Sequence, residues 1–339
     1  MPVLLFVILT LSLPKGKNPR ILSHLLMFSF STTEICDNPS MPKRPKFDSA
    51  EAESYMEFVA ALEEDPSKVS GAGRSKEQRQ MLAHELLCAA EDADHPLDML
   101  RSALRAVRLD PACLDARMML LQFTAGPPEE KIEELQQIVA IGESDLGKKF
   151  FAENSGDFWL AIETRPYMRA RAALARELQA LGRVDEAIAH TEAMLLLNPD
   201  DNQGLRYGLL GCYLEAGKLE AVRKLFTQYD EESTFFLWAR VLERYLSTEL
   251  TQAASVLLEA RKENRHVEDL LTKRRSLPKQ QPHFYSPGDI SEAVVCLDMI
   301  GAAWNRYPEA LAWLSNQSPA RPKAKAAVKR PRTRPHRKQ

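Results

Sequence analysis

The sequence predicts an all-α protein built as a solenoid of helical hairpins. Of its 339 residues, 45% are apolar and only 7% are aromatic, and glycine occurs 14 times. Ala, Leu, Glu and Arg dominate the composition, which favours helices over sheets. A helix-turn-helix unit recurs in the second half of the chain, and a solenoid can form one elongated body from a chain of this length.

The recurring unit is clearest in residues 180–202, ALGRVDEAIAHTEAMLLLNPDDN. Its Gly182 is repeated 35 residues later by Gly217. Glycine ends a helix at little steric cost because it adopts the left-handed conformation. Pro199 prevents the second helix from continuing, since its ring and missing N–H do not fit a helix interior. We therefore predict repeated hairpins over residues 166–263.

These hairpins resemble the tetratricopeptide repeat, a helical pair of about 34 residues. Matching positions are Leu174, Ala175, Leu178, Gly182, Ala187 and Pro199 in one unit, and Leu209, Tyr213, Gly217 and Phe226 in the next. A third unit is expected from Thr234 to His266, and an earlier one ends near Pro111. Thr191 and Arg265 depart from the pattern, which has an aromatic and a proline there. The resemblance implies a right-handed superhelix with a concave inner wall.

Other segments resemble the suppressor of tumorigenicity seven family and its shorter bacterial relatives. The distinctive pieces are ETRPYMRA at 163–170, LNPDDNQG at 197–204 and YSPGDISEA at 285–293. This resemblance implies no catalytic activity. The membrane segments of animal members are not carried over, because this chain shows no clear membrane span.

We expect five parts along the chain. They are a disordered, non-native or targeting extension (1–46), an N-terminal helical region (47–150), the repeats (151–266), a turn segment with a helical hairpin (267–317) and a disordered basic tail (318–339). Helices are predicted at 49–63, 76–90, 96–108, 112–124 and 129–142, then a connector at 144–158, the repeats, and a last hairpin at about 288–316.

The formal net charge of −2 hides an uneven distribution. Residues 318–339 contain nine Lys and Arg and no Asp or Glu, so the remainder is acidic. With four prolines and few large apolar side chains, this tail cannot bury enough surface to fold alone. It attracts nucleic acid or an acidic partner surface through counterion release, or it only aids solubility or folds back on the acidic body. We favour the second role, because no aromatic residue is interleaved for base stacking.

The N-terminal run PVLLFVILTLSL, residues 2–13, is shorter than the roughly 20 residues of an ordinary membrane span. Basic residues follow this run, whereas a secretory signal carries them first. A second Met, Met41, begins a stretch typical of a soluble start. We expect residues 1–40 to be a disordered or non-native extension, with a targeting or anchoring segment as the alternative.

The five cysteines are far apart, odd in number and lack a CxxC pair, which argues against disulfides and zinc. A reducing, cytoplasmic location with buried thiols is expected. In HELLC, residues 84–88, His84 and Cys88 would share a helix face, but no third ligand is suitably spaced. We therefore predict no metal and no cofactor, and place Cys88 in the core with Leu87 and Met81.

The first helix of each hairpin is expected to line the inner wall and to carry the binding site. The predicted partner-binding residues are Arg169, Arg176, Gln179, Tyr207, Gly204, Gly208 and Gly211. They would form a cationic and aromatic strip beside a shallow backbone surface, suited to an acidic or carboxylate-bearing peptide. The glycines are expected inside a helix, where each costs up to about 1 kcal/mol, and the close approach of a neighbouring helix or of a bound peptide would compensate. Alternatively, the arginines pair with Glu177, Asp185 and Glu215 on a solvated face.

The sequence thus predicts a non-enzymatic scaffold or adaptor that binds a segment of a partner protein on its concave face. The alternative is a nucleic-acid-associated protein acting through the basic tail. An enzyme is not predicted, since the sequence contains no glycine-rich phosphate loop, GxSxG or Cys/His signature.

Overall fold

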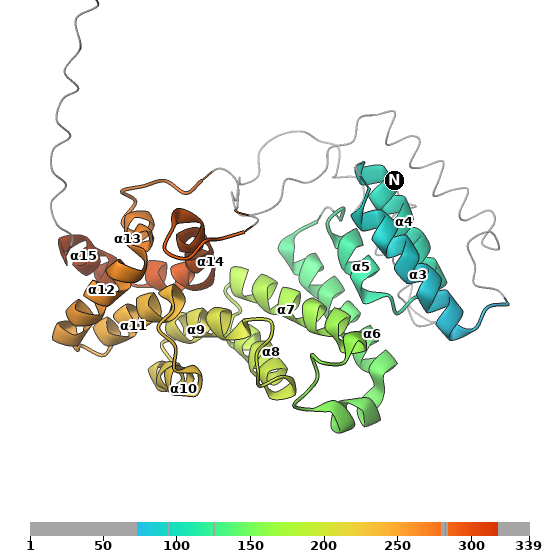
Figure 1. The fold of residues 1–339 in the computed structure, drawn as a ribbon, viewed down its shortest axis with the longest axis horizontal. Coiled ribbons are helices and arrows are strands. Elements are labelled where there is room, and N and C mark those ends of the chain that lie inside the picture. The colour runs from blue at the N-terminus through green and yellow to red at the C-terminus, as the bar shows by residue number, and fades with distance from the viewer. Residues whose placement is uncertain (1–72, 94, 125, 279–281, 283, 318–339) are drawn as a thin grey trace, which may run out of the picture. The chain divides into compact units, whose positions relative to one another are not determined.

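A computed structural model of the chain describes residues 73–93, 95–124, 126–278, 282 and 284–317. Within these ranges there are helices and turns but no strand, which confirms the all-α prediction (Figure 1). None of the helices in these ranges is long and apolar enough to cross a bilayer. The predicted helix at 49–63 and the extensions at 1–46 and 318–339 lie outside the described residues.

The helices keep the labels of Figure 1. They are α3 (Lys76–Glu91), α4 (Pro96–Leu109), α5 (Leu114–Leu121), α6 (Pro128–Asn154), the short 3-10 helix η4 (Ile162–Thr164), α7 (Arg165–Ala180), α8 (Val184–Leu197), α9 (Leu205–Glu215), α10 (Leu219–Tyr229), α11 (Thr234–Leu246), α12 (Leu250–Asn264), α13 (His266–Leu271), α14 (Ile290–Arg306) and α15 (Pro308–Gln317).

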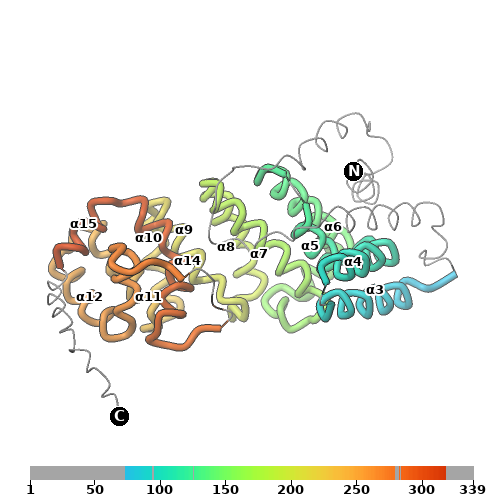
Figure 2. The backbone as a smooth tube through the Cα atoms, turned by 90° about the horizontal axis from the view of Figure 1, so that it is seen from above, coloured from blue at the N-terminus to red at the C-terminus, as the bar shows by residue number. Residues whose placement is uncertain are grey.

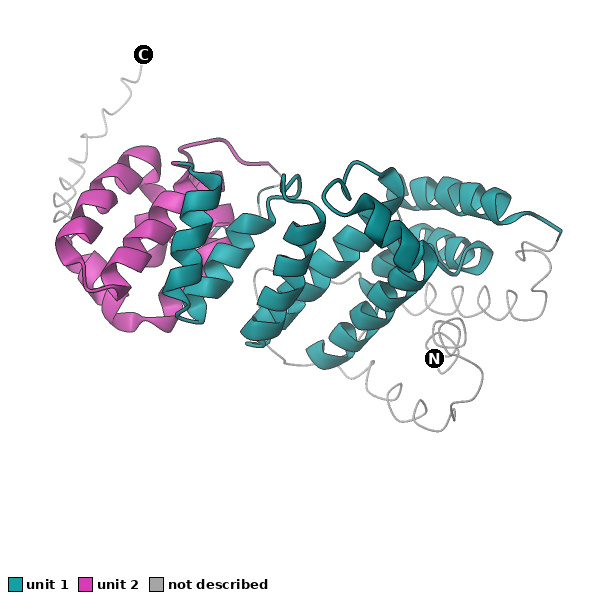
Figure 3. Ribbon diagram, turned by 90° about the horizontal axis from the view of Figure 1, so that it is seen from below, with its two compact units in different colours: residues 1–231, 278–283 teal, residues 232–277, 284–339 magenta. Residues whose placement is uncertain are grey.

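The described residues divide into two compact units, residues 73–231 with 278 and 282, and residues 232–277 with 284–317 (Figure 3). In the first unit each helix packs on the next from α3 to α10, and α5 also contacts α7; α3 and α4 lie side by side in Figure 2. In the second unit α11 packs on α12, α14 and α15, and α13 packs on α14. Each unit is therefore a stack of antiparallel helix pairs.

The turns after α7 and α9 end these two helices with glycine, as predicted. After α7, the N–H of Gly182 donates to the carbonyl of Gln179 (2.9 Å) and that of Arg183 donates to Leu178 (2.9 Å). These two bonds satisfy carbonyls that the helix end leaves without donors, and they require a left-handed residue. Gly182 has φ 74° and Gly217, after α9, has φ 69°.

The turn between α11 and α12 closes in the same way without a glycine. The N–H of Thr248 donates to Tyr245 (3.0 Å) and that of Glu249 donates to Arg244 (3.0 Å). Thr248 has φ 61°. A left-handed conformation costs an L-residue about 1–2 kcal/mol, and β-branched residues adopt it rarely. The α11–α12 hairpin therefore has the same turn geometry as the hairpins at Gly182 and Gly217, and the left-handed conformation of Thr248 costs it stability.

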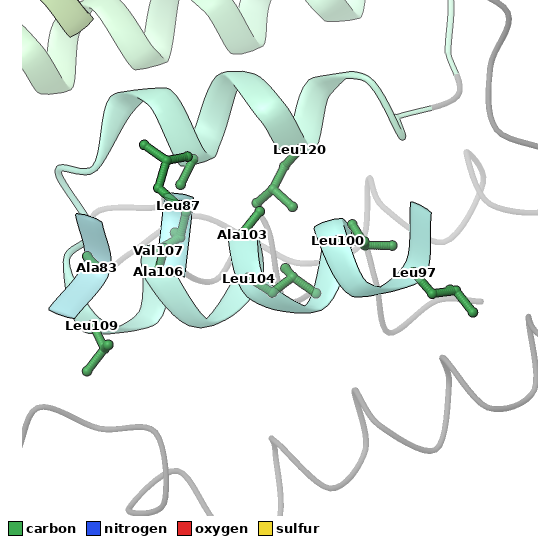
Figure 4. Close-up of a cluster of buried hydrophobic side chains, with 11 residues drawn as sticks. Ala83, Leu87, Leu97, Leu100, Ala103, Leu104, Ala106, Val107, Leu109 and Leu120 are labelled. Carbon is green, nitrogen blue, oxygen red and sulfur yellow. The ribbon is translucent and has the colours of Figure 1, made fainter. Parts of the chain in front are cut away.

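Helices α3, α4 and α5 share an aliphatic core (Figure 4). Its buried members are Ala83, Leu87, Leu97, Leu100, Ala103, Leu104, Ala106, Val107, Leu109, Ala116 and Leu120. At the start of α4 the His95 Nδ1 accepts the N–H of Leu97 (3.2 Å), and Pro96 occupies the first turn, where proline is tolerated. This core fixes the position of the first turn of α4, which borders the groove described below.

The apolar stripe of α3 differs from the predicted one. Ala83, Leu87 and Ala90 are buried, whereas Met81 is 60% exposed and Cys88 is exposed. The core placement of Met81 and Cys88 is therefore wrong, because the face turned toward α4 follows the 83, 87, 90 spacing. Cys212 and Cys296 are buried as predicted, Cys113 is half-buried, and Cys36 lies outside the described residues.

Helix α6 extends beyond its predicted end at residue 142 and includes most of the segment predicted as a connector. Gly147 interrupts it with φ 75° and ψ 154°, after which helical geometry resumes through Asn154. No atom lies within 4 Å of the place where a side chain would begin at Gly147, so backbone conformation alone requires glycine there. The kink redirects residues 148–154 relative to the first part of α6.

A buried carboxylate holds the second unit together. Glu292 Oε2 accepts hydrogen bonds from Thr234 Oγ1 (2.8 Å), Asn264 Nδ2 (2.9 Å) and the Gly288 N–H (2.8 Å). These donors come from α11, α12 and the turn before α14. The chain turns at residues 286–289, and the Asp289 carboxylate caps α14 by accepting the N–H of Ser291 (2.7 Å).

Replacing Thr248 by glycine is expected to stabilise the second unit by about 0.5–1 kcal/mol, because the strain removed exceeds the entropy that glycine adds to the unfolded chain. Urea unfolding followed by tryptophan fluorescence measures the change, since Trp238, Trp304 and Trp313 belong to this unit. The reverse exchange, Gly217→Thr, should destabilise the first unit. Equal or lower stability of Thr248→Gly would contradict the strain argument.

Candidate functional site

A groove of about 630 Å³ opens in the first unit between the start of α4, α5, the first turns of α6, and α7. Its walls are mostly apolar and include Met99, Met118, Leu121, Phe123, Ala172 and Ala173. Its charged lining residues are Glu130, Lys131, Arg169, Arg176 and Glu177. We call this the α5–α7 groove. Its size lies in the range of protein ligand sites, and its mixture of apolar walls and few polar groups is typical of them.

The local sequence explains why the space exists. Helix α5 ends at Leu121, earlier than the predicted residue 124, and the N–H of Phe123 closes a turn to the Leu120 carbonyl (3.0 Å). Pro127 and Pro128 then begin α6, and a proline pair cannot continue the preceding helix. On α7 the groove meets alanines, whose small side chains leave it open.

Two of the cations in the groove are already neutralised. Arg169 forms an ion pair with Asp115 of α5 through both ends of its guanidinium, with Nε 3.0 Å from Oδ1. Lys131 Nζ lies 2.6 Å from Glu177 Oε1. Arg176 is exposed and makes no hydrogen bond or ion pair with any residue that the structure describes. Arg176 is therefore the cation of the groove that has no partner among the described residues, and Glu130 is the lining carboxylate that has no ion pair with them.

The alternative partners predicted for the arginines are wrong. Glu177 pairs with Lys131, Asp185 accepts Lys218 Nζ (2.6 Å), and Glu215 accepts a hydrogen bond from Gln179 Nε2 (3.3 Å). Lys131 lies on the neighbouring helix α6 and Lys218 lies in the turn between α9 and α10, and only the tertiary packing sets these positions.

Gln179 and Tyr207 do not line the α5–α7 groove. The Tyr207 ring lies under the Arg206 guanidinium, whose carbon is 4.3 Å from the ring centre, and its hydroxyl accepts from Arg206 NH2 (2.7 Å). The Arg206 guanidinium therefore already covers one face of the Tyr207 ring. The role of both residues in partner binding stays a prediction.

Gly204 lies outside α9, contrary to the prediction that it is helical. It occupies the N-cap with φ 69°, and the Asp201 carboxylate accepts the N–H of Leu205 (2.6 Å), which starts the helix after the glycine. Gly208 is half-buried and Gly211 is buried within α9, as predicted. None of the three lines the groove, and their role in binding also stays a prediction.

Sequence reasoning missed the half of the groove that α4, α5 and α6 supply. Residues 47–150 were predicted as a separate helical region, so Met118, Phe123 and Lys131 were not considered for the site. The weak repeat unit ending near Pro111 was the available signal, because a further hairpin beside α7 extends the same inner wall.

Comparison with known proteins places the fold in a recognised class. Residues 178–244 match the tetratricopeptide-repeat family, so the chain carries repeats of this kind. The match runs from the end of α7 into α11, so it covers the second helix of the first predicted unit and the whole of the second unit. No curated protein and no solved structure matched the chain, and no relative supports the resemblance to the suppressor of tumorigenicity seven family.

A half-buried carboxylate, Glu134, lies on α6 one turn from Lys131. Burial, reinforced by the neighbouring Glu130, raises the pKa of Glu134 to about 7. Its Oε2 atom is buried and has no hydrogen-bond partner. The charged form of Glu134 is therefore unfavourable in the folded state.

The pKa of Glu134 is higher in the folded than in the unfolded chain. The contribution of Glu134 to the free energy of unfolding is therefore fully present at low pH and is lost as pH rises toward and through 7. Replacing Glu134 by glutamine should remove this loss and make the first unit more stable at pH 8 by on the order of 2 kcal/mol. Thermal unfolding at pH 5 and pH 8 checks this. Glu133→Gln, one residue away and exposed, is the matched control, and an equal gain in both variants would contradict the prediction.

Proposed function

Starting from the tetratricopeptide repeats at residues 178–244, we propose that the chain is a non-enzymatic scaffold whose α5–α7 groove holds a segment of a partner protein. Repeats of this kind generally mediate protein–protein interaction. The observation that carries the proposal is the exposed Arg176 guanidinium, which has no ion pair with a described residue and borders a mostly apolar groove.

The groove favours a segment that combines an apolar side chain with a carboxylate. The apolar side chain would contact Met118, Phe123 and Ala173, from which binding releases water. The carboxylate would meet Arg176, whose planar guanidinium can donate two parallel hydrogen bonds. Arg169 and Lys131 contribute less, because their charges are already paired. An acidic segment is therefore favoured over a basic one.

Two further predictions stand beside this proposal. A reducing, cytoplasmic location, which the spacing and odd number of the cysteines predict, is part of this proposal. Binding of nucleic acid through residues 318–339 remains the alternative function, and it differs from the proposal in its dependence on the tail and on salt.

Arg176→Glu is expected to weaken the binding of groove peptides at least about tenfold, because a charge-assisted hydrogen bond contributes roughly 1.5–3 kcal/mol and the reversed charge repels a carboxylate. The peptides come from a displayed library of random short peptides selected on the full-length chain, and fluorescence anisotropy measures their affinity. Arg183→Glu is the matched control, since Arg183 is exposed and lies outside the groove. Equal affinities of wild type and Arg176→Glu for every selected peptide would refute the proposal.

Deleting residues 318–339 from the full-length chain should leave the affinity for these peptides unchanged. A basic tail that carried the function would instead show affinity for nucleic acid that falls steeply with salt and disappears on tail deletion. Measuring the same peptides and a single-stranded oligonucleotide at low and high salt, with and without the tail, separates the two functions.

A further inference from the structure

A second hollow opens in the first unit between α6, α7 and α8. Its volume is about 790 Å³, and it is more open than the α5–α7 groove. Its apolar lining includes Phe151, Leu196 and Leu197, and its polar lining includes Glu143, Lys148 and Arg171. We call it the α6–α8 hollow. Neither the repeat match nor the sequence predictions assign it a role.

The hollow lies on the opposite side of α7 from the α5–α7 groove. The groove uses Arg169, Ala172, Ala173 and Arg176, which follow the spacing of one helix face. The hollow uses Tyr167 and Arg171, the positions two residues before and two residues after Arg169. Because one residue turns a helix by about 100°, two residues lead to the far side. A molecule in one site therefore does not touch the α7 residues of the other.

The kink at Gly147 builds one wall of the hollow. Without it α6 would continue straight, whereas its left-handed φ of 75° redirects the turns that carry Lys148, Phe151 and Ala152. The opposite wall is the end of α8, where the Leu197 carbonyl accepts the N–H groups of Gly156 (3.0 Å) and Phe158 (3.1 Å). Backbone contacts therefore hold both walls in place.

The rim of the hollow exposes an unusually large apolar side chain. Leu196 is 75% exposed, although α8 buries Ala187, Ile188 and Met194 on its core face. Phe151, only half-buried, lines the same hollow. Apolar side chains that line an open hollow gain free energy when a partner covers them.

Positive charge exceeds negative charge in the hollow. Arg171 donates from NH1 to the Tyr167 hydroxyl (2.5 Å) and from Nε to His190 Nδ1 (3.3 Å), both uncharged acceptors when His190 is neutral. Tyr167 in turn donates to Glu143 Oε1 (3.1 Å). Lys148 is exposed and forms no ion pair with any described residue.

We propose that the α6–α8 hollow is a second binding site, which takes a protein segment carrying a large apolar side chain next to a carboxylate. The apolar side chain packs on Phe151 and Leu196, and the carboxylate pairs with Lys148 and the Arg171 guanidinium. This inference does not rest on the groove, because the two sites share no lining residue. The first unit can then hold two partner segments at once, one on each side of α7.

Simultaneous binding at the two sites would raise the affinity for a partner that carries two such segments. Two segments held on one rigid unit meet at a high effective concentration, and two motifs of one partner bind together more tightly than either alone.

The test selects a displayed library of random short peptides on full-length Arg176→Glu protein, in which the groove is impaired. Fluorescence anisotropy then measures the selected peptides on full-length variants. Lys148→Glu and Leu196→Ser are expected to weaken binding at least about tenfold. Lys149→Glu and Leu258→Ser are the matched controls, since Lys149 is the exposed neighbour and Leu258 is 58% exposed on α12. All four positions are exposed, so each variant is expected to fold, which circular dichroism checks.

Peptides that keep their affinity on wild type, lose it on Lys148→Glu and Leu196→Ser, and are not displaced by groove peptides support the second site. The inference is overturned if no peptide is selected, if Lys148→Glu and Lys149→Glu have equal effects, or if groove peptides compete. These outcomes leave the proposed function of the groove untouched, because that proposal depends on Arg176 alone.

Discussion

The structure depends on how the first helix of each hairpin ends. The last carbonyls of a helix lack donors, and a residue in the left-handed conformation reverses the chain so that its own N–H and the N–H of the next residue reach two of them. Gly182, Gly217 and Thr248 all take this conformation and make the same pair of hydrogen bonds. The reversal brings the apolar stripes of two helices together, and their burial then stabilises the hairpin. Loss of this turn would remove the packing that positions every candidate site.

Helix α7 shows how one short sequence can serve two surfaces and a core. Tyr167, Met168, Leu174 and Leu178 are buried. The alanines and arginines between them divide by helical spacing into the face of the α5–α7 groove and the face of the α6–α8 hollow. A helix that packs on neighbours at both sides leaves two separate faces uncovered. In this unit one face of α7 borders the α5–α7 groove and the other borders the α6–α8 hollow.

Ion pairs within the first unit decide which charges remain available. Asp115 neutralises Arg169 and Glu177 neutralises Lys131, although pairs this exposed add little stability. Their effect is on recognition, because they leave Arg176 as the uncompensated cation of the groove. Lys148 likewise has no ion pair with a described residue, and the kink at Gly147 places it in the hollow. Both surfaces therefore keep a cation that has no ion pair with a described residue, for reasons that composition alone does not reveal.

The sequence by itself determined the helical class, the two glycine turns, the hairpin units around Ala187 and Leu209, and the presence of Arg169 and Arg176 on one face of α7. Local hydrogen bonding and helical spacing fix these features, and both are written in neighbouring residues. The left-handed turn at Thr248 could not be predicted in this way, because tertiary packing of α11 on α12 holds a non-glycine residue in a strained conformation. Only the tertiary structure decided that α4, α5 and α6 complete the groove and that Asp115 takes the charge of Arg169. Such contacts join residues far apart in the chain, and no local pattern encodes them.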